Sequence, residues 1–99
     1  MIWTGWNNSS RGYGFTVDSE DFHGTWATVT VELPSQSGFI AVEANVAKKS
    51  FRGRCPHLIG KRIGGWMREA GYAPWRSRMP PKFEVEPAGR RRFRVKGLA

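Results

Sequence analysis

The sequence predicts one α+β domain in which a curled antiparallel sheet of about five strands packs against one α-helix. Three observations lead to this fold class. Apolar and polar residues alternate in segments 26–33 and 39–47, an apolar stripe with helical spacing runs through 56–70, and two short alternating segments follow it. The expected order is strand, strand, strand, helix, strand, strand. A chain of 99 residues forms a single core, so 1–99 is one domain.

The first half of the chain is predicted to hold three strands. Residues 1–10 are small, polar and aromatic, and we expect them to be irregular. Residues 13–17 then alternate as a short strand. In 26–33 and 39–47 one face of each segment is apolar, and "PSQSG" between them reads as a five-residue loop. This pattern predicts an antiparallel hairpin.

The helix is predicted from Pro56 to Ala70. Proline suits a first helical position, because its missing N–H has no helical partner there. Ile59, Ile63 and Trp66 follow one another at helical spacing. Three interior glycines, at positions 60, 64 and 65, together cost about 3 kcal/mol against alanine. Packing on the sheet must therefore hold this helix together.

A second hairpin is expected at the end of the chain, with Pro87-Ala88-Gly89 as its loop. The corresponding register pairs Glu86 with Arg90 and Phe83 with Phe93. It places Phe83, Val85, Phe93 and Val95 in the core and a row of charged residues outside. Residues 97–99 are expected to form a tail.

Several classes of protein are disfavoured by composition. Cys55 is the only cysteine, whereas small secreted domains usually carry several in disulfides. The N-terminal residues lack a basic stretch followed by an apolar run, and no apolar run could span a bilayer. We therefore expect a soluble, cytoplasmic protein without membrane contact and without a cofactor.

Charge is distributed very unevenly along the chain. Residues 1–47 hold one basic and five acidic residues, for a net charge of −4, whereas residues 48–99 hold fifteen basic and three acidic residues, for +12. Such a split favours a polyanionic partner, here DNA or RNA. We expect the cations of the second half to converge on one continuous surface.

Two segments are the candidate nucleic-acid contacts. The first, Lys48–Arg54, would place cations and one aromatic ring, Phe51, beside the N-terminus of the predicted helix, where backbone N–H groups favour anions. The second is the basic face of the terminal hairpin. The predicted contact residues are Lys48, Lys49, Ser50, Phe51, Arg52, Arg54, Lys61, Arg90, Arg92 and Arg94.

Residues 11–15, "RGYGF", resemble the start of the aromatic strand in RNA-recognition motifs and cold-shock proteins. The resemblance implies that Tyr13 and Phe15 would stack on bases. It covers about a tenth of the chain and ends after Phe15, where Thr16 and Asp18 depart from the pattern. We therefore assign the chain to no family, and expect both rings to lie in the core.

A second class of function stays open, a protein-interaction module that is possibly a homodimer, because Trp and Arg are also enriched at protein interfaces. Catalysis is not expected. Cys55 and His57 lie close in the sequence, but a nucleophile needs a positioned base and an oxyanion site, and a metal needs further ligands. The sequence therefore predicts neither an enzyme nor a metal site.

Overall fold

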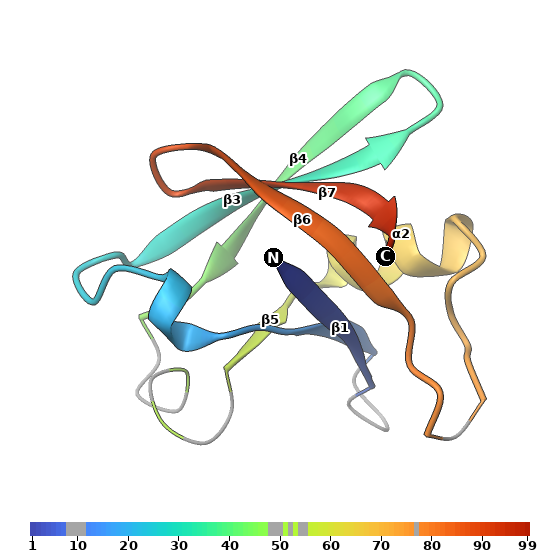
Figure 1. The fold of residues 1–99 in the computed structure, drawn as a ribbon. Helices are drawn as coiled ribbons and strands as arrows, with labels where there is room; N and C mark the ends of the chain where they lie inside the picture. Colours follow the sequence, from blue (N-terminus) through green and yellow to red (C-terminus); the bar gives the residue numbers. More distant parts are fainter. Residues whose placement is uncertain (8–11, 48–50, 52, 54–55, 77) are drawn as a thin grey trace.

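The computed structural model describes residues 1–7, 12–47, 51, 53, 56–76 and 78–99, and these form a mostly β structure. A single seven-stranded sheet curls into a nearly closed barrel with one short α-helix beside it (Figure 1). In order across the sheet, the strands are β4 (Gly38–Asn45), β3 (Thr28–Ser35), β7 (Arg92–Leu98), β6 (Lys82–Gly89), β1 (Ile2–Asn7), β2 (Tyr13–Thr16) and β5 (His57–Ile59). The helices whose bounds the structure describes are the 3-10 turn η1 (Ser19–Asp21) and the α-helix α2 (Lys61–Glu69).

The predicted α+β class, with five strands packed on a helix, is wrong. Residues 1–10 were expected to be irregular, yet β1 pairs with both β2 and β6 near the middle of the sheet. Trp3 and Gly5 face inward while their neighbours face outward, and an inward glycine hides this alternation from a hydrophobicity pattern. The expected tail is also wrong, because β7 continues to Leu98.

The helix is shorter than the sequence predicted. Residues 57–59 form β5, which pairs with β2, and α2 begins only at Lys61. The backbone of Gly60 is extended, with φ of −177°, so the chain leaves the strand before it turns into the helix. The expected apolar face is confirmed at Ile63 and Trp66, which are buried. Within the described residues, no helix has the length and hydrophobicity needed to cross a membrane.

The β3–β4 hairpin is confirmed as antiparallel, although its loop is shorter than expected. Pro34 pairs with Phe39 and Ser35 with Gly38, which leaves only residues 36 and 37 in the turn. The predicted inward faces are correct over most of both strands, with buried side chains at Val29, Val31, Leu33, Val42 and Ala44.

The terminal hairpin is confirmed, but its predicted register is wrong. Glu86 pairs with Arg94, four residues beyond Arg90, and the chain turns at residues 90 and 91 with Arg91 at a φ of 55°. At Val85 and Glu86 the shift is four residues, an even number, so these side chains stay on their predicted faces. Beyond an irregularity between Glu84 and Val85 the shift is five, and Phe83 pairs with Leu98. Phe83, Val85, Phe93 and Val95 are buried, as predicted.

A parallel junction between β3 and β7 joins the two hairpins. Val31 is opposite Phe93, and Glu32 is opposite Arg94. The Glu32 carboxylate accepts a hydrogen bond from Arg92 Nε and another, of 2.7 Å, from Arg94 Nε. These hydrogen bonds, from Arg92 first and then Arg94, hold the pKa of Glu32 below its usual value although burial opposes this. Strands about sixty residues apart in the sequence are thereby joined.

Gly14 allows β2 and β5 to pair, since a Cβ atom there would lie 2.3 Å from the Leu58 carbonyl oxygen. We expect Gly14→Ala to lower the free energy of unfolding by about 1–3 kcal/mol, because the strands must separate to admit the methyl group. Urea denaturation measures this. The control is Gly65→Ala in α2, where a Cβ would meet nothing within 4 Å, and it should stabilise by about 0.5–1 kcal/mol. Equal effects of the two substitutions would contradict this account.

Candidate nucleic-acid interface

The first predicted contact segment is only partly described by the structure. Lys48, Lys49, Ser50, Arg52 and Arg54 lie outside the described residues. Phe51 is described, and its predicted role in base stacking is wrong. Its side chain is 1% exposed and packs edge-on against the Phe22 ring at 5.2 Å. The predicted helix N-terminus at Pro56 is also wrong, because α2 begins at Lys61.

The basic face of the terminal hairpin is largely engaged by acidic side chains. Arg92 and Arg94 both bind Glu32, and Arg94 also lies 3.7 Å from Glu86. Lys96 Nζ lies 3.7 Å from Glu86. Such cations have less charge to offer a phosphate than unpaired ones. The hairpin is thus a poor candidate for a basic ribbon that enters a groove of DNA.

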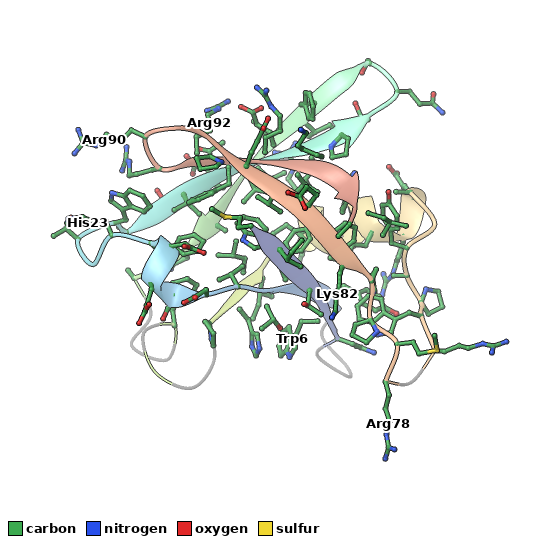
Figure 2. The ribbon with its side chains drawn as sticks, in the orientation of Figure 1. Trp6, His23, Arg78, Lys82, Arg90 and Arg92 are labelled. Carbon is green, nitrogen blue, oxygen red and sulfur yellow. The ribbon has the colours of Figure 1, made fainter. Side chains whose placement is uncertain are left out.

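The described cations of the second half do not converge on one surface, contrary to expectation. Figure 2 places Arg90 and Arg92 at one end of the molecule, near the β6–β7 turn, and Arg78 at the opposite end, with Lys82 between them near Trp6. Lys61 is exposed at the first position of α2. A nucleic-acid interface built from the described cations would therefore use one of these groups and not all of them together.

The strand that resembles RNA-binding motifs turns its aromatic rings inward. Phe15 is fully buried against Trp3 and Phe83. Tyr13 is half-buried, with the Trp75 ring at 5.0 Å and the Arg68 guanidinium above it. The expectation that these rings belong to the core is confirmed for Phe15. Gly14, which lies between the two aromatic residues, is on the outward face of β2.

A different pair of rings faces outward on this part of the sheet. Trp6 on β1 and His57 on β5 stack with their ring centroids 4.0 Å apart and their planes at 19°. The outer aromatic face, as we call it, is formed by the outward residues of β1, β2 and β5, namely Thr4, Trp6, Thr16, His57 and Ile59. Both stacked rings are half-buried, so part of each remains accessible.

The sheet register explains how rings from two non-adjacent strands meet. Trp6 is opposite Gly14 on β2, and Gly14 is opposite Ile59 on β5. His57 is opposite Thr16, so it lies on the same outward face two residues further along β2. The register therefore brings Trp6 and His57 to the same face on either side of β2.

The charges around this face differ from those of the hairpin. Lys82 is opposite Thr4 at the start of β6, on the same exposed side, and lies near Trp6 in Figure 2. No acidic partner of Lys82 is recorded among the described side chains, although Glu84 follows on the same strand face. Burial lowers the pKa of His57, so its imidazole is neutral near pH 7.

The same residues offer little to a metal ion. In the part of the chain that the structure describes, no three His, Cys, Asp or Glu side chains gather closely enough to bind one. Cys55 lies outside that part. The chemistry that the outer aromatic face can perform is therefore stacking and hydrogen bonding, through two rings and the hydroxyls of Thr4 and Thr16.

Sequence reasoning missed Trp6, His57 and Lys82 as functional candidates. The available signal was the alternation of Ile2, Thr4 and Trp6 with inward Trp3, which identifies a strand with an outward tryptophan. Comparisons with family models, with curated proteins and with solved structures each find no match. The interpretation of this face therefore depends on its own chemistry.

The stability of the protein should depend on pH through His57. Its pKa is lowered in the folded state, so the unfolded chain binds a proton more readily below about pH 6.5. The free energy of unfolding should therefore fall as the pH drops from 7.5 to 5. Urea denaturation across this range should show a weaker fall for His57→Phe, which keeps a ring on Trp6 but cannot be protonated. Parallel profiles for the two proteins would refute this role of His57.

Proposed function

We propose that the protein is a small basic module that binds single-stranded nucleic acid, DNA or RNA, on its outer aromatic face. The single observation that carries this proposal is the stacked Trp6–His57 pair on an accessible sheet surface. Unpaired bases stack on such rings, and each stacked base contributes about 1–3 kcal/mol. Because the two rings are stacked face to face, a base would stack on the outer face of the pair.

Charge supports the same proposal. The net charge of +8 attracts a phosphate backbone, and Lys82 borders the rings. The segment with Lys48, Lys49, Arg52 and Arg54 ends three residues before His57 in the sequence. These side chains remain our proposed phosphate contacts, together with Lys82. Phosphate contacts position the strand without identifying its bases, so we propose no sequence preference.

A single strand fits the site better than a duplex. Stacking on Trp6 requires a base whose face is free, which a duplex does not offer in its interior. The alternative, a basic ribbon in the major groove, needs unpaired arginines on the hairpin, yet Arg92 and Arg94 hold Glu32. The proposal includes no catalytic step and no cofactor, and it places the protein in the cytoplasm, in keeping with its lone cysteine.

Replacement of Trp6 tests the stacking contact directly. We expect Trp6→Ala to weaken binding of a fluorescent single-stranded oligonucleotide roughly 5- to 150-fold, because one or more stacked bases lose their platform. Trp6→Phe should retain most of the affinity. Fluorescence anisotropy titrations with DNA and RNA strands, and with a duplex, give these values.

The matched control is Phe39→Ala, which removes an aromatic side chain that is also exposed but lies on the β3–β4 hairpin, away from Trp6. It should leave oligonucleotide affinity within about twofold of the wild type. If the wild-type protein binds no oligonucleotide at low salt, or if the Trp6 and Phe39 variants lose equal affinity, the proposed site is wrong.

A comparison of Lys82 with Lys96 tests the proposed phosphate contact of Lys82. Both are exposed lysines on the β6–β7 hairpin, but among the described residues only Lys96 forms an ion pair, with Glu86 at 3.7 Å. We expect Lys82→Gln to reduce the slope of log affinity against log salt by about 0.7, the value for one phosphate contact on a single strand. Lys96→Gln should leave the slope almost unchanged. A larger effect at Lys96 would place the strand on the hairpin instead.

A further inference from the structure

One edge of the sheet remains unpaired in the described part of the chain. β4 pairs with β3 alone, and β5, at the other end of the strand order, comes near β4 without forming a ladder with it. Figure 1 shows the β3–β4 hairpin projecting beyond the barrel, so its tip lies away from the other strands. The projecting part of β4 begins at Gly38 and includes Phe39, Ile40 and Ala41.

The register identifies which backbone groups point outward from this edge. Pro34 has no N–H, so it and its partner Phe39 cannot form a hydrogen-bonded pair. The backbone groups of Phe39 therefore point away from β3. Since the pattern alternates, those of Ala41 and Glu43 do the same. These three residues present N–H and C=O groups that another strand can bind.

Natural edges usually carry a device against such pairing, and β4 has none of the common ones. It holds no lysine, no proline and no bulge, and its residues from 38 to 41 are all exposed. Phe39 is 50% exposed and Ile40 is 37% exposed. From Gly38 to Ala41 the edge carries no charge, and Glu43 is the one charged residue of β4. Such an edge, with accessible apolar side chains, is a surface suited to strand addition.

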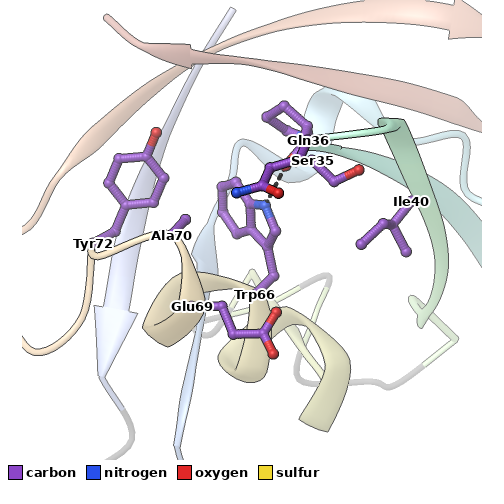
Figure 3. A pocket seen from close by; sticks show the side chains of 8 residues that line it. Ser35, Gln36, Ile40, Trp66, Glu69, Ala70 and Tyr72 are labelled. Carbon is purple, nitrogen blue, oxygen red and sulfur yellow. Dashed lines mark hydrogen bonds between the residues drawn. The ribbon is translucent and has the colours of Figure 1, made fainter.

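The space beneath the hairpin adds a hollow of mixed apolar and polar lining to this edge. A cavity of about 590 Å³ lies between the hairpin and α2, with Ile40 on one side and Trp66 on its floor (Figure 3). The Trp66 indole donates a hydrogen bond of 2.8 Å to the Pro34 carbonyl, which anchors the hairpin tip over the helix. A strand added to β4 would direct alternate side chains toward the mouth of this hollow.

We infer that the occupant of this edge is β4 of a second copy, in an antiparallel pair centred on Ala41. This register places Glu43 of each copy opposite Phe39 of the other. Within each copy the Arg94 guanidinium lies over the Phe39 ring, 4.9 Å from the ring centroid. Arg94 is also bound to Glu32 and lies near Glu86 in its own copy, so Glu43 of the other copy joins an existing charged cluster. The backbone hydrogen bonds therefore supply most of the pairing, and the charges favour this register.

The apolar side chains agree with the same register. Ile40 of one copy lies opposite Val42 of the other, on the face that borders the hollow. The pair joins two hairpins into a four-stranded sheet, with both exposed isoleucines covered. Because pairing along one short edge makes a small interface, the dimer forms in a concentration-dependent way.

Sedimentation analysis of the whole chain over a range of protein concentrations tests this inference. The wild type should change from monomer to dimer as concentration rises. Glu43→Lys should weaken dimerisation at least about tenfold, because two lysines then face the Arg94 cations. Met79→Lys, which places a charge on an exposed apolar residue elsewhere, is the control and should dimerise like the wild type.

A double variant tests the register independently of any effect on folding. Phe39→Glu combined with Glu43→Lys restores opposite charges across the pair, so it should dimerise more tightly than Glu43→Lys alone. A wild type that stays monomeric at millimolar concentration, or a dimer insensitive to Glu43→Lys, overturns the inference. Because Trp6 is not part of this edge, a failure here leaves the nucleic-acid proposal unaffected, and the reverse also holds.

Discussion

The parallel pairing of β3 with β7 is the contact on which the rest of the architecture depends, because it joins two hairpins that are far apart in the sequence. Glu32 is nearly buried at this junction and is bound by Arg92 and Arg94. A buried carboxylate without such donors would destabilise the fold, so the pairing of β3 with β7 at Glu32 depends on both arginines. Removal of this pairing would leave separate hairpins in place of a curled sheet.

The same junction determines where a nucleic acid can be bound. Arginines that neutralise Glu32 are less available to phosphates, so the most basic strand of the chain is mainly structural. The accessible aromatic surface lies elsewhere, on β1 and β5, where Trp6 stacks on His57. The β3–β7 junction thus has a structural role, whereas the proposed binding role belongs to the outer aromatic face. The β4 edge is a third region, for which we infer pairing with another strand.

Local alternation in the sequence was sufficient to predict both hairpins and most of the buried faces, because period-two patterns report directly on sheet packing. It did not reveal β1, whose inward Gly5 interrupts the pattern, or β5, whose residues match a helical spacing. The hairpin register was also hidden, since a shift of four residues at Val85 and Glu86 leaves their faces unchanged and no local pattern reports the irregularity beside them. The Trp6–His57 contact joins strands about fifty residues apart in the sequence, so no local pattern reports it.

The most direct test of the central claim is an NMR titration of the labelled protein with an unlabelled single-stranded oligonucleotide. Our account predicts that the largest shifts occur at the indole N–H of Trp6 and at the backbone amides of Thr16 and His57, and that they saturate together. Shifts confined to the β6–β7 turn around Arg90, with the Trp6 indole unchanged, would contradict it.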